Sequence, residues 1–572
     1  MNMRWDVFNC PAPLKEELSK QLDIPPLVAH LLIKRGITTP QDGQKFLSPV
    51  LHHLYNPFLM KDMDKGVERI ISALQKKEQI SIYGDYDADG ITACALLMDF
   101  LRSMGIKPSY YIPHRLMEGY GLNPEAVKKI AAQGTKLLIC VDCGISDREE
   151  IQLARQLGMD TIVVDHHEVP ALPSLAYAVL DPLRPDCPFP FKGLAGVGVA
   201  FHLVVALRSR LRESAFWQDS QEPNLRCYLD LVALGTIADI VPLVDINRVL
   251  VMYGLKELKD TVRPGLITLK EVSGIGKEEI STGHVAFRLA PRLNAGGRVA
   301  TGQLGVELLL ADAYGRARSI AAELDQANRE RQGIEERLYK EAKEDIERDG
   351  LQGQKSLVLS SDAWHPGVIG IVASKLAEEF RRPTILIALE GDAGKGSARS
   401  IAGFHVYEGL QECEEHLLGF GGHKYAAGLK ISRDKIEVFR DSFEEAVKRK
   451  LGDADFMPTI SIDAAVDLEE ITPELLNYLS FFPPYGSANP RPIFSTKEKL
   501  PIHDIRILGK DTIKFALRGK QRAYEVIGFG MGSLGAQLPA EVRIAFHPKM
   551  NDWQGVKRLQ LELRAVEADK ER

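Results

Sequence analysis

Three short apolar runs alternate with helical patterns in the first third of the chain, and this alternation limits the fold more than any other feature. The runs lie at residues 79–84, 136–141 and 160–164. Segments with helical periodicity lie between them, and each of these segments ends at a glycine. Strands that alternate with helices in this way predict an α/β fold with a parallel, doubly wound sheet.

Carboxylates and imidazoles follow each of these runs. The first run leads into Asp85, Asp87 and Asp89, the second into Asp142, and the third into Asp165, His166 and His167. On the first stretch alone, an acidic cap of the next helix explains the residues equally well. However, parallel sheets gather the carboxyl ends of their strands in one crevice. Three strand ends that all carry ligand residues therefore predict a metal site.

The residue types indicate which metal this site would hold. Several carboxylates with one or two imidazoles favour Mn²⁺ or Mg²⁺, whereas a structural zinc site usually contains cysteines. Two divalent ions about 4 Å apart would clamp a phosphoryl group and activate water for in-line attack. The chemistry that this predicts is hydrolysis of a phosphoester or a phosphoanhydride.

Composition limits the other properties of the chain. With 572 residues, of which 45% are hydrophobic, it is long enough for three or four domains. The start of the sequence has no signal-peptide pattern, and no apolar run is long enough to span a membrane, so we expect a cytoplasmic protein without membrane contacts. The net charge of −6 argues against binding of nucleic acid through the charge of the whole protein. We therefore expect any nucleic-acid binding to use a local surface.

Seven scattered cysteines fit a reducing compartment. Cys140 and Cys143 have the CxxC spacing, which alone is weak evidence for zinc or redox chemistry. Because this pair flanks Asp142 at the end of an apolar run, core thiols are the preferred interpretation.

Four motifs in order resemble those of the DHH phosphoesterase superfamily: DYDADG, VDCG, DHH and GTIADIVPL, the last of which contains Asp239. Within the superfamily the sequence is similar to the RecJ single-strand-specific exonucleases. The similarity extends over nearly the whole chain, through PRLNAGGR, HPGVIGIVA, GSARS, GGHKYAAG and PPYGSANPRPIF.

The resemblance implies an architecture of five parts. We expect an N-terminal helical extension at 1–55, a parallel doubly wound DHH domain at 56–310 and a long linker helix at 311–349. A second α/β domain of the DHHA1 type would follow at 350–454, and an OB-type β-barrel at 455–572. Short strands do predominate from residue 455 onward, as a small barrel requires.

The resemblance also implies roles for individual residues. Two ions would be held by Asp87, Asp89, Asp142, His166 and Asp239, with Asp142 as the bridge and Asp85 in or next to the ligand set. His167 would contact the scissile phosphate and Asp165 would orient the imidazoles. The implied substrate-binding residues are Arg115, Tyr120, Asn294, Arg298, Arg399, Ser400 and His423. In the barrel, interleaved basic and aromatic residues suit single strands, and we single out Phe515, Arg518 and Trp553.

The function that the resemblance implies is a 5′→3′ exonuclease that degrades single-stranded DNA to 5′-mononucleotides, in DNA repair and recombination. Its cofactors would be two Mn²⁺ or Mg²⁺ ions. Its partners would be single-stranded DNA, with a single-stranded-DNA-binding protein and a helicase as further candidates. The alternatives are a DHH phosphodiesterase or pyrophosphatase that acts on short oligonucleotides, cyclic dinucleotides or other small substrates, and a non-catalytic replication scaffold. The C-terminal barrel disfavours the first, and the complete set of motif ligands disfavours the second.

Overall fold

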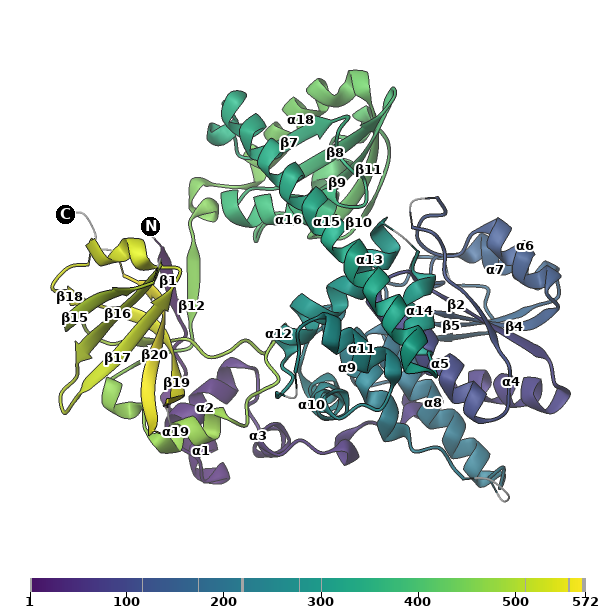
Figure 1. The fold of residues 1–572 in the computed structure, drawn as a ribbon, viewed down its shortest axis with the longest axis horizontal. Coiled ribbons are helices and arrows are strands. Elements are labelled where there is room, and N and C mark those ends of the chain that lie inside the picture. Colours follow the sequence, from purple (N-terminus) through teal and green to yellow (C-terminus); the bar gives the residue numbers. More distant parts are fainter. Residues whose placement is uncertain are drawn as a thin grey trace. The chain divides into compact units, whose positions relative to one another are not determined.

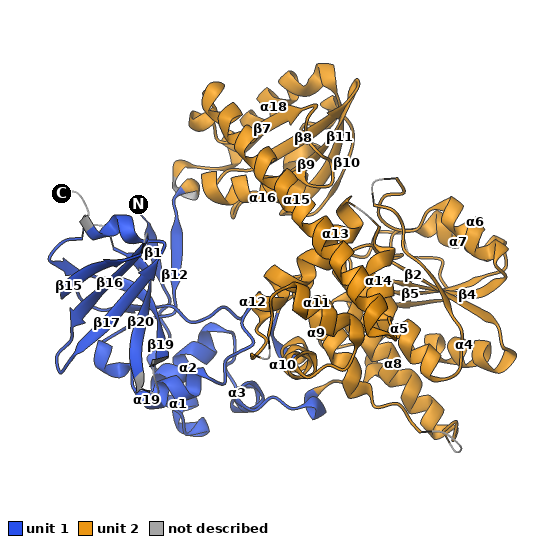
Figure 2. Ribbon diagram, viewed as in Figure 1, with its two compact units in different colours: residues 1–53, 243–245, 457–572 blue, residues 54–242, 246–456 orange. Residues whose placement is uncertain are grey.

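The computed structural model has two compact units (Figure 2). Unit 1 comprises residues 1–53, 243–245 and 457–572, and unit 2 comprises residues 54–242 and 246–456. Within the described part of the chain, no helix is both long and apolar enough to cross a membrane. The structure describes residues 3–115, 117–172, 174–217, 221–276, 278–299, 301–509, 511–536, 538–553 and 556–567.

Unit 2 begins with the predicted parallel sheet, which is confirmed (Figure 1). Its five strands run in the order β3-β2-β4-β5-β6, and every neighbouring pair is parallel. The strands are β2 (Gln79–Gly84), β3 (Ser109–Tyr111), β4 (Thr135–Val141), β5 (Asp160–Val164) and β6 (Ala178–Leu180). The helices that connect and cover them are α4 (Met63–Lys76), α5 (Ala88–Ser103), α6 (Pro124–Ala132), α7 (Arg148–Gln156), α8 (Gly196–Glu213) and α9 (Leu229–Ala238).

Helices cover both faces of this sheet. On one face, Ile130 of α6 and Ile151 of α7 join Leu138 and Val163 of the strands in one apolar cluster. On the other face, α4, α5 and α8 pack against the strands. Both faces are therefore buried, which explains why the strands read as continuous apolar runs rather than alternating ones.

A helical region follows, in which small residues lie inside a helix. The motif PRLNAGGR, at residues 291–298, belongs to α13 (Ala290–Val299), which follows the π-helical turn η4 (Val285–Leu289). The reason is tertiary packing, because a Cβ on Gly297 would lie 2.7 Å from the Tyr86 carbonyl oxygen. Only glycine lets the helix approach so closely, which outweighs its low helix propensity. The other helices here are α10 (Asp245–Lys259), α11 (Pro264–Val272), α12 (Thr282–His284) and α14 (Gln303–Leu309).

The predicted long charged helix is α15 (Tyr314–Arg348). Its first half packs against α11, α13 and α14. Its second half places Leu338, Ala342 and Ile346 in the apolar cluster of the next sheet. The mostly charged helix α15 therefore has one buried stripe, which packs against two parts of unit 2 and connects them.

That next sheet confirms the predicted second α/β region. Its order is β10-β11-β9-β8-β7, in which only β7 and β8 are parallel. Phe404, Phe439 and Phe443 fill the core beneath it. The elements are β7 (Leu357–Ser361), α16 (Ile369–Phe380), β8 (Thr384–Glu390), β9 (Ala393–Arg399), α17 (Val406–Gln411), β10 (Leu417–Gly422), β11 (Ala426–Ser432) and α18 (Ile436–Lys450).

Unit 1 contains the expected C-terminal β domain, a curled sheet of eight strands (Figure 1). The strand order is β13-β14-β19-β20-β17-β16-β15-β18, and α19 (Pro473–Leu479) lies in the chain between β13 and β14. The strands are β13 (Ala464–Val466), β14 (Phe494–Thr496), β15 (Leu500–Leu508), β16 (Thr512–Arg518), β17 (Ala523–Phe529), β18 (Glu541–Val542), β19 (Ile544–Trp553) and β20 (Val556–Val566).

The N-terminal helices share the core of this β domain. Leu31 and Leu32 of the second helix lie in one apolar cluster with Phe494 and Phe515. The Arg35 guanidinium donates hydrogen bonds to the Asn489 Oδ1 at 2.9 Å and to the Pro490 carbonyl at 2.7 Å. The two ends of the chain therefore build one core. The elements involved are β1 (Arg4–Val7), which pairs in parallel with β12 (Thr459–Ile462), and helices α1 (Ala12–Leu22), α2 (Pro26–Lys34) and α3 (Pro40–Leu47).

This shared core predicts coupling between distant parts of the sequence. We expect Leu31→Ala to destabilise unit 1 by about 2–5 kcal/mol, because it removes buried methyl groups and leaves a cavity. Hydrogen exchange of the β16 and β17 amides should accelerate. Leu508→Ala is the matched control, since Leu508 is 42% exposed. Unchanged exchange in β16 and β17 of the Leu31 variant would contradict the shared core.

Candidate metal centre

The predicted ligand residues meet at the carboxyl ends of β2, β4 and β5. Their side chains form three overlapping groups, and within each group the ligand atoms lie within 4.8 Å of one another. Asp142 belongs to two of the groups and His166 to two. The groups are Asp142, His166 and His167; Asp89, His166 and Asp239; and Asp85, Asp87 and Asp142.

The first acidic stretch is both a helix cap and part of this cluster. Asp87 is the N-cap of α5, and its Oδ1 accepts hydrogen bonds from the Asp89 amide at 2.9 Å and the Gly90 amide at 3.2 Å. A Cβ on Gly90 would lie 2.6 Å from the Asp85 amide nitrogen, so only glycine allows the loop to fold back onto the helix. The acidic stretch therefore caps a helix and also lies in the ligand cluster, so the two sequence-based interpretations do not exclude each other.

Asp89 is buried and oriented by the start of another helix. Its Oδ2 accepts a hydrogen bond from the Gly196 amide at 2.6 Å, and its Oδ1 accepts one from the Val197 amide at 2.9 Å. These amides belong to the N-terminus of α8, where free N–H groups and the helix dipole favour an anion. Even so, burial and the charge of Asp87 raise the pKa of Asp89 to about 7.

Asp142 lies at the centre of the cluster. Its backbone φ is 60°, a left-handed conformation that costs energy for a residue with a Cβ. Its Oδ1 is 3.0 Å from the His166 Nε2. Burial and the neighbouring carboxylates, Asp89 first among them, raise the pKa of Asp142 well above its usual value. A Cβ on Gly196 would lie 2.8 Å from the Asp142 Cβ, so this glycine leaves room for the carboxylate.

The cluster has an excess of negative charge that its own residues do not balance. Burial and Asp87 raise the pKa of Asp85 well above normal, and burial and Asp89 raise that of Asp239 to about 8. The Asp85 Oδ1 is buried and has no hydrogen-bond partner among the described residues. Buried carboxylates without cationic partners are unstable, and divalent cations supply both the charge and the missing contacts. The donor set therefore fits two divalent metal ions that prefer oxygen ligands.

The two adjacent histidines differ in protonation. Burial lowers the pKa of His166 to about 4, so its ring is neutral and its Nε2 is available as a ligand. Burial also acts on His167, but the hydrogen bond from its Nδ1 to the Asp165 Oδ1, at 2.7 Å, raises its pKa to about 9. Asp165 contacts His166 only through the backbone amide, at 2.8 Å. Among the described contacts, the Asp165 carboxylate therefore orients the ring of His167 but not the ring of His166.

Two predicted substrate-binding residues lie in the loop after β3. The Tyr120 hydroxyl donates a hydrogen bond to the Asp142 carbonyl at 3.1 Å and lies 3.1 Å from the His167 Nδ1. Half of Tyr120 is exposed. The Arg115 guanidinium stacks on the Tyr86 ring at 4.8 Å. Tyr120 therefore borders the metal centre, and Arg115 adjoins the acidic loop that carries Asp85 and Asp87.

A basic cluster adjoins the metal centre. Burial, followed by the charges of Arg115 and Arg331, lowers the pKa of Arg298 to about 10. The Arg298 guanidinium also donates to the Gly367 carbonyl at 3.0 Å, which lies in the second α/β region. The Arg399 guanidinium is held by the Ser374 and Ser397 hydroxyls, each at 3.0 Å. Mutually repelling guanidinium groups of this kind favour a polyanion.

The other predicted contact residues have local bonds. The Asn294 Oδ1 accepts a hydrogen bond from the Ala88 amide at 2.8 Å, so it supports the start of α5. The Ser400 hydroxyl donates to the Phe404 carbonyl at 3.0 Å. His423 is exposed in the turn between β10 and β11, with its Nδ1 3.7 Å from the Glu168 Oε2.

The prediction that Phe515 of the β domain binds nucleic acid is wrong. Phe515 is 1% exposed and belongs to the core of unit 1, so it is not available for base stacking. The reason is the alternation of β16, which turns Ile513, Phe515 and Leu517 inward and leaves Arg518 exposed. The side chain of Trp553 lies outside the described residues.

Sequence reasoning missed two features of the site. Arg331 of α15 acts electrostatically on Arg298, but in the sequence it is one of many charges on a long helix. Gly196 and Gly235 leave space for the carboxylates, and a Cβ on Gly235 would lie 2.8 Å from the Asp89 Oδ1. A glycine inside an apolar helix beside a predicted ligand is the signal that identifies such positions.

Three protein families match the chain. Residues 79–236 match the DHH family, N-terminal domain; residues 353–449 match the DHHA1 domain; and residues 462–565 match the RecJ OB domain. The parallel sheet, the sheet of β7 to β11 and the eight-stranded sheet correspond to these three segments in that order.

Relatives of known name match nearly the whole chain. The chain is 39% identical over 569 residues to the single-stranded-DNA-specific exonuclease RecJ of Bacillus subtilis, covering 98% of this chain and 70% of that protein. A crystal structure of RecJ from Thermus thermophilus in complex with Mn²⁺ is 31% identical, with a TM-score of 0.84, covering 100% of this chain and 80% of that one. A second structure, of RecJ from the same organism with Mg²⁺, is 29% identical, with a TM-score of 0.77 and coverages of 100% and 79%.

The repulsion among the buried carboxylates predicts how the protein responds to metal removal. Mn²⁺ at 100 times its Kd should stabilise the fold by about 2.7 kcal/mol, because it binds only the folded state. Asp142→Asn removes one repelling charge, so the metal-free variant should melt at or above the temperature of the metal-free wild type. It should gain much less from Mn²⁺. Differential scanning calorimetry with EDTA or Mn²⁺ measures both effects.

The matched control for this experiment is Asp186→Asn, since the Asp186 side chain is 54% exposed and lies outside the cluster. This variant should gain as much from Mn²⁺ as the wild type does. Equal stabilisation of the Asp142 variant by Mn²⁺ would exclude Asp142 as a ligand.

Proposed function

The chain belongs to the RecJ family of single-stranded-DNA-specific exonucleases, and we propose that it removes 5′-mononucleotides successively from the 5′ end of single-stranded DNA. It is a metal-dependent exonuclease of the DHH and DHHA1 type, with an OB domain for single-stranded DNA. Its metal ions are Mn²⁺ or Mg²⁺, the ions present in the Thermus thermophilus RecJ structures.

One observation carries the proposal of hydrolysis with two ions. Asp142 and His166 are each shared between two of the three ligand groups at the strand ends. Shared ligands bring two ions close together, as in-line displacement at a phosphodiester requires. We assign Asp85, Asp87, Asp89, Asp142, His166 and Asp239 to the ions, with Asp142 as the bridge.

The bound ions would polarise a phosphate oxygen and lower the pKa of the attacking water. The chain's own residues position the substrate and supply protons. In the metal-free chain the hydrogen bond to Asp165 raises the pKa of His167 to about 9, and we propose that the resulting imidazolium donates a hydrogen bond to an oxygen of the scissile phosphate. Asp165 accepts a hydrogen bond from the His167 Nδ1 at 2.7 Å, which stabilises the imidazolium and leaves its Nε2–H to donate to the phosphate.

The guanidinium groups beside the centre bind the strand. Arg115, Arg298 and Arg399 form a positive surface for phosphate groups. We assign the end of the strand to Arg115 and Tyr120, since Tyr120 contacts both Asp142 and His167. Asn294, Ser400 and His423 complete the proposed substrate contacts, with Asn294 acting through the start of α5.

The two alternatives fit the chain less well. A phosphodiesterase for cyclic dinucleotides or short oligonucleotides has no need of the RecJ OB domain at residues 462–565. A non-catalytic scaffold has no need of the full ligand set, which in this chain converges within 4.8 Å in each group.

We also propose a location, a cellular role and partners for the enzyme. We place the enzyme in the cytoplasm, in DNA repair and recombination, with a single-stranded-DNA-binding protein and a helicase as partners. We also propose the five domains that the resemblance implies, at residues 1–55, 56–310, 311–349, 350–454 and 455–572.

Polarity is the most direct test of the proposed function. With Mn²⁺, a 5′-labelled single strand should release labelled mononucleotide at once, whereas a 3′-labelled strand of equal length should release its label last. Blunt duplex should resist digestion. Asp142→Ala should lower the rate by at least about 10³-fold while the protein stays folded, and Asp186→Ala should leave it unchanged. Early release of the 3′ label, or equal digestion of duplex, would contradict the proposal.

The β domain gives a second test. Arg518 is exposed at the end of β16, and we expect Arg518→Ala to raise KM for long single strands. The salt dependence of binding should fall by about one unit of slope, because one phosphate contact is lost. Turnover on very short strands should stay the same.

A point variant is preferable here to deleting residues 455–572. Such a deletion would expose the buried faces of α1 and α2, which share the core of the β domain. Lys45→Ala, on α3 of the same unit, serves as a charge-matched control and should leave KM unchanged. An unchanged KM and salt slope in the Arg518 variant would remove Arg518 from the DNA-binding surface.

A further inference from the structure

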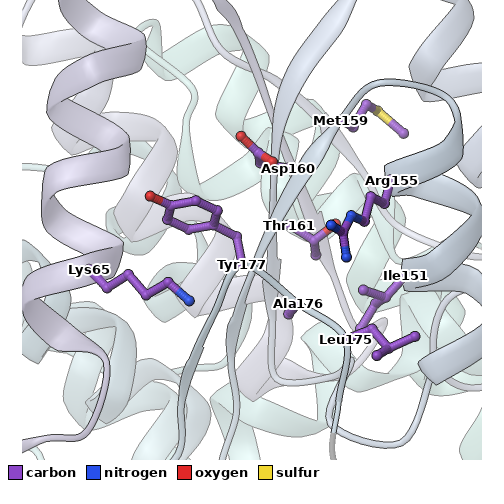
Figure 3. A pocket seen from close by; sticks show the side chains of 9 residues that line it. All are labelled: Lys65, Ile151, Arg155, Met159, Asp160, Thr161, Leu175, Ala176 and Tyr177. Carbon is purple, nitrogen blue, oxygen red and sulfur yellow. The ribbon is translucent and has the colours of Figure 1, made fainter.

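A cavity lies in the parallel-sheet region of unit 2, at the amino-terminal end of β5 (Figure 3). It has a volume of about 370 Å³. Its wall comes from α4, the end of α7, the start of β5 and the segment that leads into β6. The lining residues are Lys65, Ile151, Arg155, Met159, Asp160, Thr161, Leu175, Ala176 and Tyr177.

The cavity is separate from the metal centre. β5 begins at Asp160, in the cavity wall, and ends at Val164, directly before the metal-centre residues Asp165 and His166. At about 3.3 Å per residue, the length of this strand places the two sites roughly 15 Å apart, at opposite ends of the sheet. A ligand in the cavity therefore does not occupy the catalytic centre.

The charges of the wall favour an anion. Lys65 and Arg155 reach the cavity from opposite sides (Figure 3), and neither has an ion-pair partner among the described residues. The Lys65 Nζ lies over the Tyr177 ring at 4.8 Å. The one carboxylate of the wall, Asp160, is already paired with Arg69 at 2.6 Å. The two remaining cations give the cavity a net positive charge.

An unpaired hydroxyl also indicates a ligand. Thr161 is 3% exposed and lines the cavity, and its Oγ1 has no hydrogen-bond partner within the described part of the chain. Its carbonyl is already bonded to the Tyr177 amide at 2.8 Å. Buried polar groups almost always have a partner. An oxygen atom of a bound anion, close to Arg155, would provide one.

We infer that this cavity binds a mononucleotide. The phosphate would lie between Lys65 and Arg155 and accept a hydrogen bond from the Thr161 hydroxyl, because a dianion matches two unpaired cations. The sugar and base would pack against Tyr177 and the apolar wall of Ile151 and Leu175. A peptide carboxylate carries one charge and matches this wall less well. The choice of a nucleotide rests on the proposed function, whose product belongs to this class.

Calorimetric titration of the full chain in EDTA tests this inference without hydrolysis. We expect dAMP to bind one-to-one, inorganic phosphate to bind more weakly, and deoxyadenosine, which has no phosphate, to give no signal. Arg155→Gln and Thr161→Val should each weaken dAMP binding by about tenfold or more. The matched control Lys128→Gln, on an exposed residue of α6, should leave it unchanged. Arg115→Gln, which alters the proposed phosphate contact beside the metal centre, should bind dAMP in the cavity like the wild type.

Three results would overturn the inference. The first is dAMP binding that is unaffected in both the Arg155 and the Thr161 variants. The second is binding that is lost in Arg115→Gln, which would place the nucleotide beside the metal centre. The third is the absence of dAMP binding while a short peptide binds through its terminal carboxylate. Because exonuclease activity is not read out, a failure of the proposed function would show separately in the polarity assay.

Discussion

The mutual repulsion of buried carboxylates at three strand ends is the constraint on which the rest of the structure depends. Asp85, Asp89 and Asp142 lie almost fully buried, and burial together with their neighbours raises the pKa of each. The parallel sheet brings them together because its strands all end at one edge. The N-terminus of α8 and the absence of a side chain at Gly196 then hold two of them in place. Bound cations would therefore stabilise this cluster.

Positively charged side chains and a neutral imidazole occupy different positions around this cluster. Asp165 keeps His167 protonated, while burial keeps His166 neutral beside the acidic residues. Arg298 and Arg399, which come from different parts of unit 2, carry positive charge next to the centre. A polyanion bound there would contact imidazolium and guanidinium groups, while the ligand atoms remain free for metal ions. This division of charge suits hydrolysis of a phosphodiester.

The sequence predicts local patterns well and long-range packing poorly. The strand ends with their ligands were predictable because strand periodicity and Asp or His side chains are both local signals. The burial of Phe515 was also predictable, because Ile513, Phe515 and Leu517 occupy every second position of β16 and therefore share one apolar face. Packing between distant segments was not predictable. The sharing of Leu31 with the C-terminal core depends on contacts across more than four hundred residues, as does the 2.8 Å bond from His30 to the Asp463 carbonyl. Likewise, the free hydroxyl of Thr161 is visible only once its neighbours are placed.

We propose that two divalent ions share Asp142. Titration of metal-free protein with Mn²⁺, followed by electron paramagnetic resonance, counts the bound ions and detects their magnetic coupling. We expect two coupled ions in the wild type, loss of tight binding for both in Asp142→Asn, and loss of only one in Asp239→Asn, because Asp239 belongs to a single ligand group. A single ion in the wild type, or two uncoupled ions that survive Asp142→Asn, would show that Asp142 does not bridge two ions.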